Sequence, residues 1–326
     1  MKSILIRTLG GKGIGYGHYY RCLSLAKAIL YLNKNIDIIF LINNELVTQI
    51  KNTNFKYILE NNLEEDYRII EELKVDLFIF DSYLGSNEYL KEVKKKTRLM
   101  LIDDNNDIYN SLIPDIIYNG NIHAKKLNYN MVKGQLALLG SEYLIMREEY
   151  WDSKLNIFDK KEGILITTGG TDEYGVAYKI VSEIKDLGVK IRVIIGPSYK
   201  DDYIKKIEKI SNKNIELVYS PNSLKNYLSY SEIVITAGGS TIYEVLAQKC
   251  IPVVFSIADN QDLICQEMKF MGVEYLGKYP NIEYFRLRDV IRNIQHEERN
   301  INSTMFEIIN SRGALMVAKK ILDYIC

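Results

Sequence analysis

The chain has 326 residues, a length that suits two domains of ordinary size better than one hydrophobic core. Its 42 basic and 42 acidic residues give a formal net charge of zero, which argues against a general nucleic-acid-binding surface. The four cysteines lack CxxC and CxH spacing, so neither a zinc site nor a disulfide framework is indicated. The apolar run at 3–6 is too short for a signal peptide, and no run approaches the ~20 residues of a membrane span. We expect a cytoplasmic protein with reduced thiols, no nucleic-acid partner and no stable membrane insertion.

Short β-branched or apolar runs alternate with longer amphipathic ones, which predicts doubly wound parallel sheets. The first half predicts strands at 4–7, 36–41, 57–59, 77–80, 98–102 and 116–118. A polar, charged stretch at 147–162 predicts a linker, after which strands are predicted at 163–167, 191–195, 215–218, 233–236 and 252–255. The fold class we expect is α/β, with two Rossmann-like domains at 1–157 and 158–326 facing across a cleft. A last helix at 314–325 has no partner that periodicity alone can identify.

The first predicted strand leads into a loop of closely spaced glycines, among them Gly15 and Gly17, which ends at His18 and a predicted helix. Glycines let backbone N–H groups approach a ligand, and a helix N-terminus favours negative charge, so the loop is typical of an anion site. Histidine is the side chain best suited to proton transfer near neutral pH, and the chain has only two others, His123 and His296. The alternative is a capping or hydrogen-bonded structural histidine. The position at a strand-to-helix turn favours the ligand interpretation.

Two further glycine turns follow predicted strands of the second half. The first contains Gly169, Gly170 and Thr171, and the second contains Gly238, Gly239, Ser240 and Thr241. The second turn opens a predicted helix with Glu244 one turn in, so it suits a diphosphate, with Glu244 accepting hydrogen bonds from a ribose. The alternative is a capping box, in which Ser240 or Thr241 caps the helix. Asn260 and Gln261 follow another strand, and no P-loop or NAD fingerprint occurs in the right context.

Three aspartates, Asp81, Asp103 and Asp104, follow predicted strands, where carboxylates reach the carboxyl edge of a parallel sheet. They are suited to orienting His18, to binding sugar amides or simply to capping the next helix. The pair Asp103-Asp104 lacks a histidine cluster or a third spaced carboxylate, so it does not indicate a metal site. We therefore expect no metal and no cofactor.

Three more polar residues are candidates for substrate contacts. Asn119 and Asn121 suit hydrogen bonds to acetamido groups, although loop asparagines more often serve turns. Arg21 lies three residues after His18 on the same face of the predicted helix. It suits either a phosphate or sugar contact or an ion pair with a carboxylate.

These motifs together resemble the nucleotide-sugar hydrolases of pseudaminic acid biosynthesis, the UDP-2,4-diacetamido-2,4,6-trideoxy-β-L-altropyranose hydrolase family. The matching segments, in chain order, are 14–26, 80–83, 102–104, 119–124, 140–150, 169–172, 237–241 with Glu244, and 258–261. The resemblance runs nearly end to end. It implies inverting attack by water at the anomeric carbon of a UDP-linked amino sugar, with His18 as the base and Tyr83 near the sugar. The helix start at 238–241 suits the departing diphosphate without a metal ion.

The second half also resembles the UDP-binding domain of the GT-B glycosyltransferases, in which the residue matching Glu244 grips the ribose of UDP. This resemblance implies a GT-B-like fold with UDP, part of the substrate and a product, held by the second domain. Leu9 stands where the pseudaminic enzymes have an aspartate, and relatives with Gly-Gly at 10–11 occur among spore-coat and surface-polysaccharide proteins. The alternative function is a glycosyltransferase that uses a UDP-sugar donor in surface or spore-coat polysaccharide synthesis. A binding protein without turnover is disfavoured by His18.

Overall fold

The computed structural model describes residues 2–11, 14–151, 161–296 and 304–325. The chain forms two compact units, one of Met1–Asp152 with Asn310–Cys326 and one of Ser153–Ile309. We call them unit 1 and unit 2. This division corrects the assignment of 158–326 to a single domain, because the described residues from 310 onward, 310–325, belong to unit 1. The expected boundary at 157/158 lies outside the described residues, as does most of the predicted linker.

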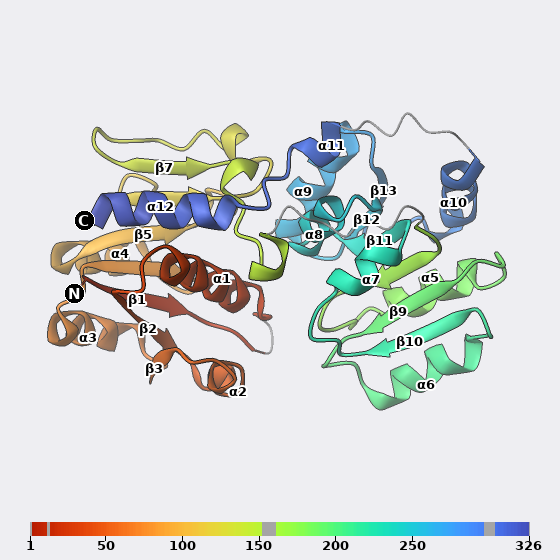
Figure 1. Cartoon of the computed structure of the whole chain (residues 1–326), viewed down its shortest axis with the longest axis horizontal. Coiled ribbons are helices and arrows are strands. Elements are labelled where there is room, and N and C mark those ends of the chain that lie inside the picture. Colours follow the sequence, from red (N-terminus) through yellow and green to blue (C-terminus); the bar gives the residue numbers. More distant parts are fainter. Residues whose placement is uncertain (1, 12–13, 152–160, 297–303, 326) are drawn as a thin grey trace. The chain divides into compact units, whose positions relative to one another are not determined.

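Unit 1 contains a seven-stranded parallel sheet (Figure 1). Its strands are β1 (Lys2–Thr8), β2 (Ile36–Ile42), β3 (Lys56–Leu59), β4 (Leu77–Asp81), β5 (Arg98–Ile102), β6 (Ile116–Asn119) and β7 (Leu136–Leu139). The order across the sheet is β3-β2-β1-β4-β5-β6-β7, and every neighbouring pair is parallel. The sequence did not predict β7, because this edge strand is only four residues long and mostly half-buried.

Helices cover both faces of this sheet. They are α1 (Gly17–Leu32), α2 (Val47–Lys51), α3 (Asp66–Leu73), α4 (Asn87–Lys96) and α12 (Gly313–Ile325). The apolar faces of α1 and α12 share one core with β1, β2 and β4, and α3 and α4 close the other face. Gly313 begins α12 with its backbone against Leu144, so closely that a Cβ would overlap Leu144 backbone atoms. The C-terminal helix is therefore part of the unit 1 core.

Unit 2 contains a six-stranded parallel sheet in the order β10-β9-β8-β11-β12-β13. Its strands are β8 (Ile164–Thr167), β9 (Ile191–Ile195), β10 (Ile215–Tyr219), β11 (Ile233–Ala237), β12 (Ile251–Ser256) and β13 (Glu274–Lys278). Its helices are α5 (Val176–Ile184), α6 (Asp201–Ile210), α7 (Lys225–Tyr230), α8 (Thr241–Ala247), α9 (Asp259–Phe270), α10 (Leu287–His296) and α11 (Thr304–Glu307). The edge strand β13 was also not predicted, since it carries Gly277 and two charged residues at its ends.

The strand order of each sheet reverses once. In unit 1, β2 and β3 are added in turn on one side of β1, and β4 then lies on the other side of β1. In unit 2 the same reversal separates β8 from β11. Open parallel sheets bind ligands at the carboxyl ends of the strands beside such a switch point. The parallel α/β fold class is thus confirmed, and it singles out one edge of each sheet.

Candidate active site

His18 is the second residue of α1 and lies beside the switch point of unit 1. Its Nδ1 is 2.6 Å from Oδ1 of Asp81, the fully buried last residue of β4. An ionised carboxylate can only accept, so Nδ1 donates its proton to Asp81 in the neutral imidazole. No described residue hydrogen-bonds to Nε2, which therefore carries the free lone pair. This is the arrangement that a histidine general base requires.

Arg21 lies one turn after His18 and pairs with two carboxylates. Its Nε and Nη2 donate to the two oxygens of Asp81 at 3.0 and 2.8 Å. Nη1 and Nη2 donate to Asp104 at 2.6 and 3.1 Å. Burial favours the neutral form of Arg21, but Asp104 and Asp81 outweigh it and raise its pKa well above the ordinary value. Of the two alternatives for Arg21, the carboxylate pair is the one that the structure contains.

The two carboxylates remain ionised for the same reason. Burial acts to raise the pKa of Asp81, but the charge of Arg21 and the contact with His18 hold it below its usual range. Burial likewise opposes the charge on Asp104, whose pKa Arg21 holds well below the ordinary value. Since both carboxylates share one guanidinium, they behave as a single charged cluster.

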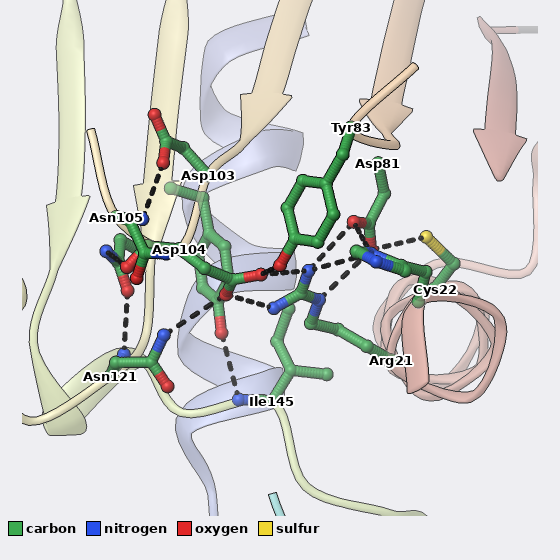
Figure 2. A network of polar contacts seen from close by, with 12 residues as sticks. Arg21, Cys22, Asp81, Tyr83, Asp103, Asp104, Asn105, Asn121 and Ile145 are labelled. Atoms are coloured by element: carbon green, nitrogen blue, oxygen red, sulfur yellow. Dashed lines mark hydrogen bonds and ion pairs between the residues drawn. The ribbon is translucent and has the colours of Figure 1, made fainter. Parts of the chain in front are cut away.

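Asp104 links three segments of unit 1 (Figure 2). It accepts from Arg21 of α1, from the hydroxyl of Tyr83 at 2.6 Å and from Nδ2 of Asn121 at 3.1 Å. Tyr83 follows β4 and Asn121 follows β6, so Asp104 fixes loops at the carboxyl ends of two strands. The Tyr83 ring meets the His18 ring edge-on, with the centroids 4.7 Å apart. Tyr83 is among the exposed apolar side chains, so a ligand at this edge can reach it.

Two expected ligand contacts are corrected. Asn119 is fully buried, and its amide donates to the Asp104 carbonyl at 2.9 Å and to the Tyr129 hydroxyl at 2.9 Å, so its side chain supports the loops instead of facing a ligand. Asp103 is also buried, and its Oδ1 accepts from the backbone N–H groups of Asn105 and Asn106, both at 2.8 Å. It caps a turn, the least functional of the roles considered for it.

Gly15 and Gly17 border His18 on the loop that precedes α1. A Cβ at either residue would meet no atom of the described residues within 4 Å. Gly15 has φ of +79°, a conformation that glycine adopts without strain. Lys12 and Gly13 lie outside the described residues. The two glycines remain proposed contacts.

In unit 2 the predicted glycine turns follow β8 and β11, the strands on either side of the switch point, and the third turn follows β12. One part of the expectation is corrected, because the N–H groups of Gly238 and Gly239 are already donated to Phe255 and Ala237 at 2.9 and 2.8 Å. The backbone at Gly238 also lies against Cys265, with no room for a Cβ. The N–H and hydroxyl groups of Ser240 and Thr241 donate to no other described residue, although the Ser240 carbonyl accepts from the N–H of Tyr243 at 3.1 Å. The Ser240 side chain makes no cap bond. The capping-box alternative is therefore not what this turn forms.

The turn after β8 is fixed by the aspartate that follows it. Asp172 accepts from the N–H groups of Val176 and Ala177 at 2.8 and 2.7 Å, which fixes the start of α5. This leaves Gly169, Gly170 and Thr171 exposed at the sheet edge, with no described atom within 4 Å of a Cβ at either glycine. These residues are accessible to a ligand.

The remaining candidates of unit 2 differ in what they do. Asn260 is exposed, whereas Gln261 accepts from the N–H of Ile257 at 3.0 Å and so stabilises its own turn. Glu244 is half-buried on the first turn of α8. A role in ribose binding remains a proposal for Glu244.

The sequence reasoning did not identify two side chains that complete the unit 1 cluster. The Cys22 thiol donates a hydrogen bond to Oδ2 of Asp81 at 3.4 Å, and the Tyr129 hydroxyl accepts one from the Asn119 amide. Burial, with the charge of Asp81, raises the pKa of the Cys22 thiol well above its usual value, so it stays protonated. A signal for Cys22 was available, because it lies four residues after His18 on the same face of α1. Tyr129 comes from a long loop, and no sequence pattern identifies it.

In the parts of the chain that the structure describes, no group of three or more His, Cys, Asp or Glu side chains is placed to hold a metal ion. No helix there is long and apolar enough to cross a membrane.

No known protein-family model matches the sequence. The chain is 25% identical over 334 residues to an uncharacterised protein of Methanocaldococcus jannaschii, covering 98% of this chain and 68% of that protein. It is 26% identical over 285 residues to the UDP-2,4-diacetamido-2,4,6-trideoxy-β-L-altropyranose hydrolase of Campylobacter jejuni, covering 85% of this chain and all of the relative. It is 24% identical over 251 residues to the spore coat polysaccharide biosynthesis protein SpsG of Bacillus subtilis, covering 73% of this chain and 72% of the relative.

Solved glycosyltransferase structures share the fold. MurG of Acinetobacter baumannii superimposes with a TM-score of 0.65 and 13% identity, covering 99% of this chain and all of that one. UGT89C1 of Arabidopsis thaliana, in complex with UDP-L-rhamnose, gives a TM-score of 0.68 and 8% identity, covering 99% of both chains. At these identities the likeness concerns the fold alone. The chain therefore has the expected GT-B-like fold and is a distant relative of the C. jejuni hydrolase and of SpsG.

Proposed function

We propose that the protein is a nucleotide-sugar hydrolase that cleaves a UDP-linked amino sugar at the anomeric carbon. The observation that carries this proposal is the His18–Asp81 pair, with Nδ1 bonded at 2.6 Å and Nε2 not bonded by any described residue. A positioned base of this kind typically contributes ~10²- to 10⁴-fold to a rate. The distant relationship to the C. jejuni hydrolase supports the choice of reaction.

In the proposed reaction, Nε2 of His18 removes a proton from a water molecule as its oxygen attacks the anomeric carbon. The bond between that carbon and the diphosphate oxygen breaks, and UDP leaves with the electron pair. Asp81 stabilises the imidazolium that forms, since it already accepts from Nδ1. The products are the free sugar and UDP, and attack opposite the leaving group inverts the anomeric centre.

For the nucleotide we propose the sheet edge of unit 2. The N–H and hydroxyl groups of Ser240 and Thr241 and the exposed turn at 169–171 are suited to hydrogen-bonding a diphosphate. Donors of this kind stabilise the departing charge without a metal ion. Glu244 would accept from the ribose hydroxyls, with Asn260 at the edge of the same site.

For the sugar we propose the surface around His18, formed by Gly15, Gly17, Tyr83 and Asn121. Arg21 and Asp81 act behind this surface, because both are engaged with each other and with Asp104 or His18. A diacetamido-trideoxy sugar, as in pseudaminic acid biosynthesis, is the substrate class we propose.

A glycosyltransferase is the second candidate, and the 24% identity to SpsG together with Leu9 favours it. In that case a sugar hydroxyl replaces water as the acceptor and His18 keeps its role. One experiment separates the two reactions. Purified protein is incubated with UDP-linked deoxyamino sugars in the absence of any acceptor, and UDP release is followed by phosphorus NMR. Stoichiometric UDP release supports the hydrolase, whereas release only after an acceptor sugar is added identifies a transferase.

A further inference from the structure

The glycine turn after β8 packs backbone to backbone against the loop that follows β9. A Cβ at Gly196 would lie 2.5 Å from the carbonyl oxygens of both Gly169 and Gly170, so only glycine fits between the two segments. The N–H of Ser198 donates to the carbonyl of Gly170 at 3.0 Å. Both carbonyls of the turn therefore face the segment at 196–198.

This contact fixes the direction of two N–H groups. The peptides of the turn are trans, and in a trans peptide the carbonyl and the N–H of the next residue point in opposite directions. Because the carbonyls of Gly169 and Gly170 face Gly196, the N–H groups of Gly170 and Thr171 are directed away from it. No described residue accepts a hydrogen bond from either N–H, and both residues are exposed. Successive backbone N–H groups held in this way are a common anion-binding arrangement.

We propose that Gly196 is a positioning residue of the nucleotide site, because its lack of a side chain lets the loop after β9 hold the N–H groups of Gly170 and Thr171 in place for the diphosphate. The inference rests on the nucleotide site proposed above for unit 2. Gly196 is buried behind the turn and does not itself face the ligand. Donors that are fixed before the ligand arrives avoid the entropy cost of ordering them on binding.

A side-chain hydrogen bond joins the same two segments. Thr168 immediately precedes the glycine turn, and its hydroxyl is hydrogen-bonded to the hydroxyl of Tyr199 in the loop after β9. Both side chains are buried. This bond can be removed without adding volume, so it offers a milder way to loosen the turn than a substitution of Gly196.

The test is calorimetric titration of UDP into full-length wild type and Gly196→Ala, at a temperature at which thermal melts show both proteins to be folded. The added methyl group must displace the turn or the loop behind it. The affinity for UDP should therefore fall by about tenfold or more, the equivalent of one lost hydrogen bond to a charged group.

Gly188→Ala is the matched control, because Gly188 precedes β9 at the opposite end of that strand. Gly188 has φ of +74°, and a Cβ there would meet no described atom within 4 Å. Alanine at this position strains the backbone without touching the turn. The control should melt at a lower temperature than the wild type and bind UDP with the same affinity.

Tyr199→Phe is the second variant, to be used if Gly196→Ala does not fold. Loss of the bond to Thr168 should weaken UDP binding about two- to tenfold. Wild-type affinity in folded Gly196→Ala, or in Tyr199→Phe where it replaces that variant, would overturn the proposal, as would an equal loss in Gly188→Ala. A wild type that does not bind UDP would reject the nucleotide site proposed for unit 2, and this inference with it. Equal UDP binding by wild type and Gly196→Ala would reject only this inference.

Discussion

The two sheet edges of this protein share one topology but carry different chemistry. In unit 1 the edge beside the β1/β4 switch point holds Asp81, Asp104, Arg21 and His18 in one network of short polar contacts. In unit 2 the edge beside β8/β11 holds glycine turns and hydroxyl groups, with no comparable ion-pair network among the described residues there. A buried charged cluster fixes protons and rotamers, whereas open turns leave donors available to a ligand. The contrast suggests that unit 1 supplies the chemistry and unit 2 holds the leaving group.

The largest effect we expect is on turnover by His18→Ala. Loss of the base should lower kcat by roughly 10²- to 10⁴-fold. The melting temperature should also fall, because His18 is buried and its loss removes one partner of Asp81, so the melts establish that the variant is folded at the assay temperature. Steady-state kinetics with a UDP-linked amino sugar, with thermal melts as the control, measures both. Near-normal turnover would remove the chemical role assigned to unit 1.

The charged cluster should make the stability of unit 1, and not of unit 2, depend on Asp81. The pKa of Asp81 is held below its usual range, chiefly by Arg21 and His18 against the effect of burial. Its contribution is therefore present above its unfolded pKa of about 4 and is lost as the pH falls through the lower folded value. Asp81→Asn should lower the free energy of unfolding by on the order of 3 kcal/mol at pH 6, because Arg21 then lacks one of its two carboxylate partners.

Trp151 provides the readout for this variant, because it is the only tryptophan and is buried in unit 1. Urea unfolding followed by Trp151 fluorescence gives the free energy of unfolding of each protein. The difference in this free energy between wild type and Asp81→Asn should become smaller below pH 4. A difference that does not depend on pH would mean that Asp81 contributes through packing and not through its charge.

A smaller loss of stability is expected from a substitution that disturbs the packing of the C-terminal helix α12 on unit 1. Gly313→Ala places a methyl group on the Leu144 backbone, and such overpacking typically costs about 1–3 kcal/mol. Gly17→Ala is the matched control, because Gly17 too is the first residue of a helix but a Cβ there would meet no described atom within 4 Å. It should be neutral or stabilising by up to ~1 kcal/mol. Equal unfolding midpoints for the two variants would contradict the close packing of α12.

The smallest effect we expect is that of metal removal. Neither sheet edge has a cluster of metal-binding side chains among the described residues, and the proposed diphosphate donors are hydroxyl and N–H groups. UDP release should therefore continue in excess EDTA. Complete loss of activity that Mg²⁺ restores would instead make Asp103 and Asp104 candidate ligands.

Much of the fold was predictable from the sequence because buried parallel strands read as continuous apolar runs. Every predicted strand is present to within two residues at its ends, and only the edge strands β7 and β13 were missed. The carboxyl-edge position of His18 and Asp81 followed from strand order alone. The role of each polar group could not be predicted, because the hydrogen-bond partners of the Asn119 side chain and the Gly238 N–H depend on three-dimensional contacts. The place of α12 in unit 1 also depends on packing that periodicity does not encode.

The division of labour between the two units is tested most directly by calorimetric titration of UDP into wild type, His18→Ala and Glu244→Ala. A carboxylate that accepts ribose hydroxyls makes hydrogen bonds worth about 1.5–3 kcal/mol each. Glu244→Ala should therefore weaken UDP binding roughly ten- to a hundredfold or more, whereas His18→Ala should bind UDP like the wild type. Equal affinity of wild type and Glu244→Ala, or loss of UDP binding in His18→Ala, would contradict the assignment of the nucleotide to unit 2.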